Sequence, residues 1–290
     1  MTSEEIIASI KIKGSFPTSN DLFSNSDFLS LINHQMKTEI IPTMLLLSEE
    51  FFLLSKDYTI ATGSTYRIPA RAIGAKVRDL QYADGSSNLS KLVRLDESDR
   101  PSNPSGYYVV RNSIELSNDF TGNTLRMKYF GRPNDLVLST SCGQITSIDT
   151  GAFSVVVSSL PSAITTNSIV DFVQALNPYD LLDYDKTVVG VSGTTVTFSS
   201  LPTGLVVGDW LCVASQAPVP MIPEEMHPVL VQSALVAALA AKKDKSVEFE
   251  SKVLERVKQD AIRMMDPRVE NDSASFRSGR LLGYFANRWN

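Results

Sequence analysis

The sequence predicts an α+β protein: a helical bundle formed by N- and C-terminal helices, with an inserted antiparallel β region that includes a small two-repeat barrel or sandwich. Three observations predict this class. Apolar residues recur with a period near 3.6 at both ends of the chain, they recur with a period near 2 between residues 57 and 133, and residues 135–216 contain two similar segments. Because the helical segments flank the strands, the two ends of the chain have to pack together.

Helical spacing of apolar residues extends from Asp21 to Leu54. Asp27 is the predicted N-cap of a first helix, and a second helix is predicted to begin after Thr38. Pro42 falls within the first turn of that second helix, where its missing N–H costs least. Both helices are amphipathic, so each needs a partner to cover its apolar side.

From Asp57 onward the period changes to about 2, which indicates β-strands. Residues 57–70 are predicted to form a hairpin that turns at Gly63. Further strands are predicted over residues 75–85, 105–117 and 123–133, divided by Gly85, Asn112 and Gly122.

An internal repeat follows the first β region. The segment "ITSIDTGAFSVVVSSLP" (145–161) is echoed by "VVGVSGTTVTFSSLP" (188–202), and each copy precedes a strand entered through an aspartate, Asp171 or Asp209. Each unit is therefore predicted to be a hairpin, a Ser-Ser-Leu-Pro turn and a strand. Since a hairpin alone is marginally stable, the two units are expected to pair into one small barrel or sandwich.

The chain then returns to helix. Pro223 and the two glutamates after it suit a helix N-terminus, and the pair Lys242 and Lys243 suits its C-terminus. A second helix is predicted over residues 247–265, ended by Pro267. The expected domains are 1–56 (N-terminal helices), 57–134 (first β region), 135–216 (repeated-hairpin β insertion), 217–268 (C-terminal helices) and 269–290 (extended C-terminal arm).

Composition narrows the class of protein. A net charge of −5 and a pI of about 5.2 argue against a general nucleic-acid binder, which needs a basic face. Cys142 and Cys212 are too few for a disulfide scaffold, so both are expected to be small buried apolar residues. The longest uncharged helical stretch, residues 226–241, is too short and too polar to span a bilayer, so no membrane contact is expected.

Catalytic signatures are missing from the sequence. His34 and His227 are expected to be structural histidines with satisfied hydrogen bonds, and no nucleophile with an adjacent base, metal motif or phosphate-binding loop is found. The sequence thus predicts no enzyme, no metal and no cofactor. Two acidic runs are expected to be solvated loops, or alternatively to line an acidic pore: Asp96, Glu97 and Asp99, and Asp180, Asp183 and Asp185.

The last ten residues, "LLGYFANRWN", are unusually apolar for a chain end. Burying their five large apolar side chains gains roughly 8 to 15 kcal/mol, and ordering ten residues costs about 15 kcal/mol. The balance favours a segment that becomes ordered on a partner, although docking on its own bundle is the alternative. The last eighteen residues carry a charge of +3 and the remainder −8, so arginines of this arm can pair with acidic groups on that partner.

Four segments occur in a characteristic order along the chain. They are "YRIPARAIGAKVRDLQY" (66–82), "TLRMKYFGRP" (124–133), the unit from "QITSID" to "SSLP", and "VGDWLCVA" leading to "PVPMIPEEMHPVL". Together these segments resemble the head-to-tail adaptor (neck ring, connector) proteins of tailed bacteriophages. The resemblance is an order of segments that covers most of residues 30–270.

The resemblance implies a structural virion protein, assembled in the host cytoplasm, that forms a dodecameric ring beneath the portal protein. A further neck or tail protein would bind on the other side, and genomic DNA would pass through the ring without specific binding. The alternative function is a tail, baseplate or capsid-decoration module that binds through the β insertion. The portal-docking arm would be Ser273–Asn290, with Phe276, Arg277, Arg280, Leu281, Leu282, Tyr284, Phe285, Arg288 and Trp289 as contact residues.

Overall fold

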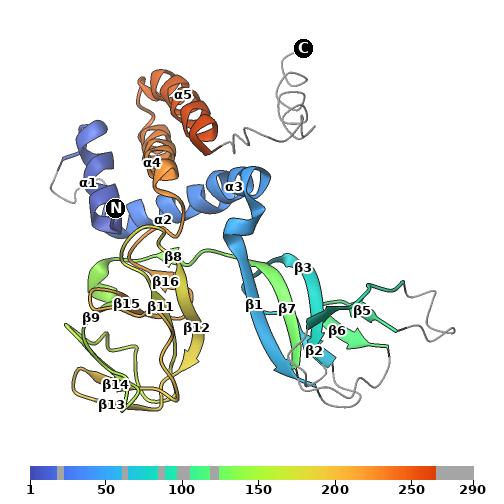
Figure 1. Ribbon diagram of the computed structural model, residues 1–290. Helices are drawn as coiled ribbons and strands as arrows, with labels where there is room; N and C mark the ends of the chain where they lie inside the picture. The colour runs from blue at the N-terminus through green and yellow to red at the C-terminus, as the bar shows by residue number, and fades with distance from the viewer. Residues whose placement is uncertain (18–22, 61–64, 84–88, 97–104, 118–123, 266–290) are drawn as a thin grey trace.

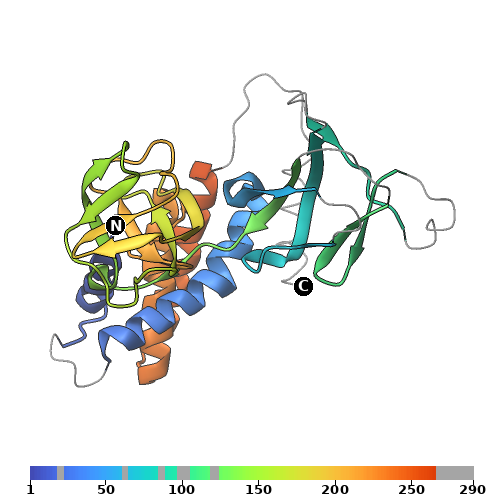
Figure 2. The same cartoon turned by 90° about the horizontal axis from the view of Figure 1, so that it is seen from below.

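A computed structural model describes residues 1–17, 23–60, 65–83, 89–96, 105–117 and 124–265. The protein is a mixed α and β structure with antiparallel sheets and a few helices, which confirms the prediction that helices and antiparallel sheets occur together. The helices lie together on one side of two separate β regions (Figure 1), and from below these β regions lie side by side without overlapping (Figure 2). The helical elements are α1 (Ser3–Lys13), α2 (Asn25–Gln35), η1 (Met36–Ile40), α3 (Ile41–Leu47), η2 (Glu49–Phe52), η4 (Ser139–Ser141), η5 (Glu224–Met226), α4 (His227–Lys242) and α5 (Val247–Met265).

The run from α2 through η1 to α3 is continuous, whereas the sequence predicted a break near Thr38. The N-cap of α2 is Ser24, and the predicted cap, Asp27, instead completes a capping box by accepting the Ser24 N–H at 2.8 Å. Within η1 the turn widens to a π-helix, which accommodates the ring of the following Pro42 inside the helical run.

Helices from the two ends of the chain share one hydrophobic core. α4 contacts α1, α2 and α5, so it is central among the helices. Phe28 and Ile32 from α2 and Leu230 and Leu235 from α4 are at most 1% exposed within this core. The sequence predicted that N-terminal helices pack against C-terminal ones, and residues from both ends of the chain do share this core.

The first β region is made of two sheets, in the orders β1-β7-β3-β4 and β2-β6-β5, which enclose a common core. The predicted hairpin over residues 57–70 is wrong, because its two halves join different sheets: β1 pairs with β7, and β2 pairs with β6. Each strand can then place apolar side chains in the core from its own side, as Leu54 and Tyr66 do. The strands are β1 (Leu53–Thr59), β2 (Thr65–Arg67), β3 (Ala72–Ala83), β4 (Leu89–Lys91), β5 (Tyr107–Val110), β6 (Ser113–Leu116) and β7 (Thr124–Gly131).

The β insertion is a seven-stranded sheet in the order β12-β11-β15-β9-β10-β14-β13. As predicted, the repeated units pair with each other: hairpin β9-β10 meets hairpin β13-β14 through β10 and β14, and strand β11 meets strand β15. The remaining strands β8 and β16 form a short parallel ladder. The strands are β8 (Asp135–Leu136), β9 (Gly143–Asp149), β10 (Ser154–Val157), β11 (Ile169–Val173), β12 (Leu181–Thr187), β13 (Gly190–Ser192), β14 (Thr195–Thr197), β15 (Trp210–Val213) and β16 (Gln216–Ala217).

The register relates the two units by an approximate two-fold axis. In the ladder between β10 and β14, Ser154 is opposite Thr197 and Val156 is opposite Thr195, so equivalent positions of the repeat exchange partners. One apolar core, which includes Phe172 and Phe198, fills the space between the units. The repeat visible in the sequence is therefore a pair of structural units that complete each other's sheet.

Candidate functional site

All of the residues predicted for the docking arm, from Phe276 to Trp289, lie outside the described residues. The same is true of Pro267 and of Glu97 and Asp99 in the first acidic run. The polar groups that the structure brings together belong to other parts of the chain.

Four polar side chains of the described residues form one bonded network, the buried polar junction, which we define as Arg71, Asn134, Asp171 and Asp185. Its centre is the ion pair between Arg71, which is 7% exposed, and Asp171, which is fully buried. One Arg71 nitrogen donates to both Asp171 carboxylate oxygens, at 3.1 and 3.0 Å, and also to Asp185 at 3.0 Å. Burial disfavours the Arg71 charge, but Asp171 and Asp185 outweigh it and raise the pKa of Arg71.

Backbone groups complete the hydrogen bonding of the Asp171 carboxylate. It accepts the N–H of Ser215 at 2.8 Å and the N–H of Asp185 at 2.9 Å. The Asn134 amide donates to Asp171 at 2.8 Å and accepts from Arg71 at 2.9 Å. Because its polar atoms are satisfied, the junction is a rigid structural connection between the first β region and the β insertion.

Tyr184 on β12 extends this connection. The Arg71 guanidinium lies 5.1 Å from the centre of the Tyr184 ring, and the Tyr184 hydroxyl donates to the carbonyl of Ser55 on β1 at 2.6 Å. Asp183 pairs with Lys186 at 2.9 Å. The expectation of a solvated loop for the second acidic run is therefore wrong, since two of its members lie on β12 and hold ion pairs.

Asp209 is the counterpart of Asp171 in the second repeat unit and is 1% exposed. Its carboxylate accepts the N–H of Ala175 at 3.0 Å and the N–H of Val206 at 2.9 Å. Asp171 bonds to the backbone beyond β15, and Asp209 bonds to the backbone beyond β11. The sequence predicted only that each aspartate stands where a strand begins. In the structure, each aspartate also bonds to the backbone that follows the strand of the other repeat unit.

His227 begins α4 and is 1% exposed. Neither ring nitrogen has a hydrogen-bond partner of good geometry, although backbone groups of Ile222 and Pro220 lie close enough to favour the protonated ring, so His227 is a buried structural histidine, as expected, with weaker hydrogen bonding than expected. The ring packs on Tyr179, with 5.2 Å between ring centres. Burial, followed by the positive N-terminus, lowers the pKa of His227 to about 4. His34, by contrast, is exposed on α2.

Cys142 and Cys212 are both buried free thiols, as predicted. The register of β9 with β15 places Gly143 opposite Leu211, which makes the two cysteines cross-strand neighbours. Burial, followed by the contact with Cys142, raises the pKa of Cys212. Among the described residues, no group of three or more His, Cys, Asp or Glu side chains could hold a metal ion.

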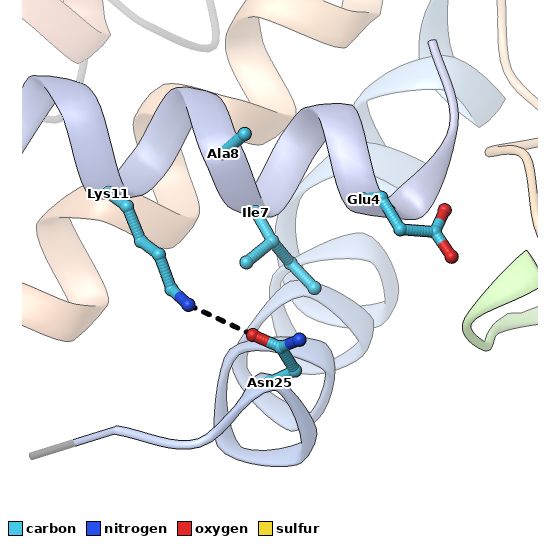
Figure 3. A pocket seen from close by; sticks show the side chains of 5 residues that line it. All are labelled: Glu4, Ile7, Ala8, Lys11 and Asn25. Atoms are coloured by element: carbon cyan, nitrogen blue, oxygen red, sulfur yellow. Dashed lines mark hydrogen bonds between the residues drawn. The ribbon is translucent and has the colours of Figure 1, made fainter. Parts of the chain in front are cut away.

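A shallow pocket of about 170 Å³ lies along α1 (Figure 3). Lys11 donates to Asn25 at 3.0 Å across one side of it. Glu4, at the other side, accepts the backbone N–H of Ser139 at 2.6 Å. Because the pocket is smaller than typical ligand sites and its charged groups are already bonded, it is not a candidate cofactor site.

No protein-family model matches the sequence, and no curated protein matches it significantly. Within the described ranges, no helix is both long and apolar enough to cross a membrane. The function therefore rests on the residues and their arrangement.

Proposed function

We propose that the protein is a head-to-tail adaptor of a tailed-bacteriophage virion, a structural protein without catalytic activity. Copies of it form a ring in the virion neck, dock under the portal through the C-terminal arm, and form part of the channel for DNA ejection. The observation that carries the proposal is the sharing of one core by helices from both ends of the chain, with α5 leading directly into the arm. α5, the last described element of the chain, lies on the side of the helices away from the β regions (Figure 1).

The architecture that we propose for this ring subunit is a helical bundle with an inserted β barrel. Contacts of α4 with α1, α2 and α5 support the bundle. Pairing of the two repeat units around a single apolar core supports a small barrel for the β insertion.

α5 supports association with a second copy. It is strongly amphipathic: Leu254 and Ala261 are buried, and Val247, Val257 and Met265 are partly buried against the same core. Phe249 is 67% exposed and Met264 is 71% exposed on the same helix. In a ring, a neighbouring subunit would cover such apolar positions, whereas a monomer would leave them in water.

We propose that a durable attachment to the portal comes from many weakly binding arms that act together. The gain from burying the aromatic arm residues and the cost of ordering the arm nearly cancel for one chain. In a closed ring, many arms dock together, so weak single contacts produce a durable attachment. The arginines of the arm, Arg277, Arg280 and Arg288, would pair with acidic groups of the portal.

Deletion of residues 273–290 tests the proposal. Binding of the purified protein to portal-containing particles would be measured by sedimentation and electron microscopy. We expect the truncated protein to keep its far-UV circular dichroism spectrum and to lose attachment. As a matched control, Phe153→Ser removes one exposed aromatic residue that lies outside both the arm and α5, and it should leave portal attachment nearly intact. Normal attachment of the truncated protein contradicts the proposal.

The alternative function, a tail, baseplate or capsid-decoration module, is favoured by one observation on the β insertion. Leu176, Val206 and Val207 are 74%, 53% and 61% exposed, and the hydrogen bonds of Asp209 hold the two loops that carry them together. Replacing these three residues by serine separates the two functions. Loss of virion binding in this variant, with normal binding of the arm deletion, would favour the alternative.

A further inference from the structure

Four cationic side chains, Arg67, Lys76, Arg111 and Arg132, form a group that we call the basic patch. All four are exposed. None of them makes an ion pair with another residue in the part of the chain that the structure describes. No carboxylate of the described residues therefore neutralises them.

Backbone contacts bring Arg67 and Arg111 together. The N–H of Ile68 donates to the carbonyl of Asn112 at 2.9 Å, so the residues next to them in the chain are in direct contact. Arg67 ends β2, and Arg111 lies in the two-residue turn between β5 and β6.

Lys76 follows Arg67 along the chain, and Arg132 contacts the backbone between these two residues. The N–H of Arg132 donates to the carbonyl of Arg71 at 2.8 Å. Between Ala72 and Val77 the register of β3 with β7 shifts, and the extra residues bulge out beside the end of β7 with Lys76 exposed. Residues 68 and 71, which make these two backbone contacts, are three positions apart in the chain and so at most roughly 11 Å from each other, which places the two contacts near each other.

The backbone of Arg111 adopts the conformation of a tight turn. Its φ angle is 54°, in the left-handed region that glycine or asparagine usually occupies in such a turn. Glycine can therefore replace Arg111 without strain in the backbone.

Charge is segregated between the two β regions. Residues 57–134 contain 11 Lys and Arg against 8 Asp and Glu, whereas residues 135–216 contain 1 against 7. The net charge of the whole chain conceals this separation. The first β region is thus locally basic in a protein that is acidic as a whole.

The chemistry of the surface fits a phosphate backbone better than an acidic protein. The centre of a protein interface needs large apolar side chains. In the described part of the first β region, the exposed large apolar residues are Leu89 and Val93, at 39% and 65% exposure. Separate positive side chains with no apolar centre suit a polymer that carries regularly spaced negative charges, as the phosphate backbone of a nucleic acid does.

We propose that the basic patch is a sequence-independent binding surface for the phosphate backbone of duplex DNA. This inference deepens the proposed adaptor function by naming the surface that contacts the passing genome. The acidic remainder of the chain keeps the contact weak, so that DNA is guided without being held.

Binding of the full chain to a fluorescently labelled 30-base-pair duplex, measured by anisotropy between 20 and 200 mM NaCl, tests the proposal. The variant Arg67→Gln/Lys76→Gln/Arg132→Gln should bind at least tenfold more weakly at 20 mM NaCl. The slope of log affinity against log salt should fall by about 2.7, near 0.9 for each lost phosphate contact. The control Lys13→Gln/Lys245→Gln/Lys252→Gln removes the same charge elsewhere and should change affinity less than twofold.

Arg111→Gly separates binding from folding, because glycine suits the left-handed turn. This variant should keep or raise the melting temperature while its salt slope falls by about 0.9. Absence of DNA binding by the wild type at 20 mM NaCl overturns the proposal, and so does equal weakening by patch and control variants. Equally good competition by polyglutamate would assign the surface to an acidic protein and also overturn it. Because no portal is used, failure here leaves the proposed portal attachment untouched.

Discussion

Replacing Arg71 by leucine perturbs the buried polar junction at its centre. The variant leaves the Asp171 carboxylate fully buried without its counter-charge. Removing one partner of a buried ion pair costs roughly 3 to 5 kcal/mol, because the other charge remains desolvated. Three hydrogen bonds to Asp171 persist, from Asn134, Ser215 and Asp185, so we expect the lower end, about 3 kcal/mol.

Urea unfolding followed by far-UV circular dichroism measures this loss. At a denaturant slope of about 2 kcal/mol/M, a loss of about 3 kcal/mol moves the midpoint by about 1.5 M. Adding Asp171→Asn to the Arg71→Leu variant removes the uncompensated charge. The free-energy loss of the double variant should therefore be about 1 to 3 kcal/mol smaller than the sum of the single losses. A loss below about 1 kcal/mol for Arg71→Leu, or strictly additive losses, would refute the reasoning.

Three further predictions concern buried positions. Burial, then the N-terminal charge, lowers the pKa of His227 from 6.5 to about 4, so below pH 6.5 the unfolded chain gains a proton that the folded chain does not bind. Stability should therefore fall by roughly 3 kcal/mol as the pH drops from 6.5 to 4, and His227→Phe should flatten the melting temperature across this range; an unchanged slope contradicts the assignment. Cys142 and Cys212 should react with Ellman's reagent only after unfolding, and rapid reaction of either thiol in the native protein would show that the site is open. Gly106→Ala should lower the free energy of unfolding by about 1 to 3 kcal/mol, because its new Cβ would lie 2.4 Å from a backbone carbonyl oxygen. The control Gly190→Ala places its Cβ where no atom lies within 4 Å, so it should have little effect. Equal effects of the two variants would argue against this packing.

Several elements could be predicted closely from the sequence because their signals are local. α5 occupies residues 247–265 as predicted, since a long amphipathic stripe fixes the helix without reference to the rest of the chain. The repeat units also pair as predicted, because two similar hairpins with exposed edges complete each other.

Other elements depended on competition between distant segments. The expected hairpin over residues 57–70 has a plausible turn, but β1 gains more by pairing along its whole length with β7 than by folding back on β2. The N-cap of α2 was misplaced by three residues, because Ser24 and Asp27 are both good capping residues and their spacing lets both participate.

The buried polar junction could not be predicted from the sequence. Arg71 and Asp171 are separated by 100 residues, and nothing in the chain links them until two sheets and a linker are packed together. Asp185 carried a signal, as part of an acidic run, but the run indicated a solvated loop. The partner of a buried charge is chosen by the fold, whereas the sequence shows only that the charge exists.

By itself, the sequence determined the class of fold, the repeat, the helices at both ends and the reversed charge of the C-terminal arm. These features follow from periodicity and composition, which are properties of neighbouring residues. Only the tertiary structure decided which strands share a sheet and which aspartate meets Arg71. These outcomes depend on contacts between residues that are far apart in the chain. The packing of the whole molecule decides which of these residues are buried and which of them pair.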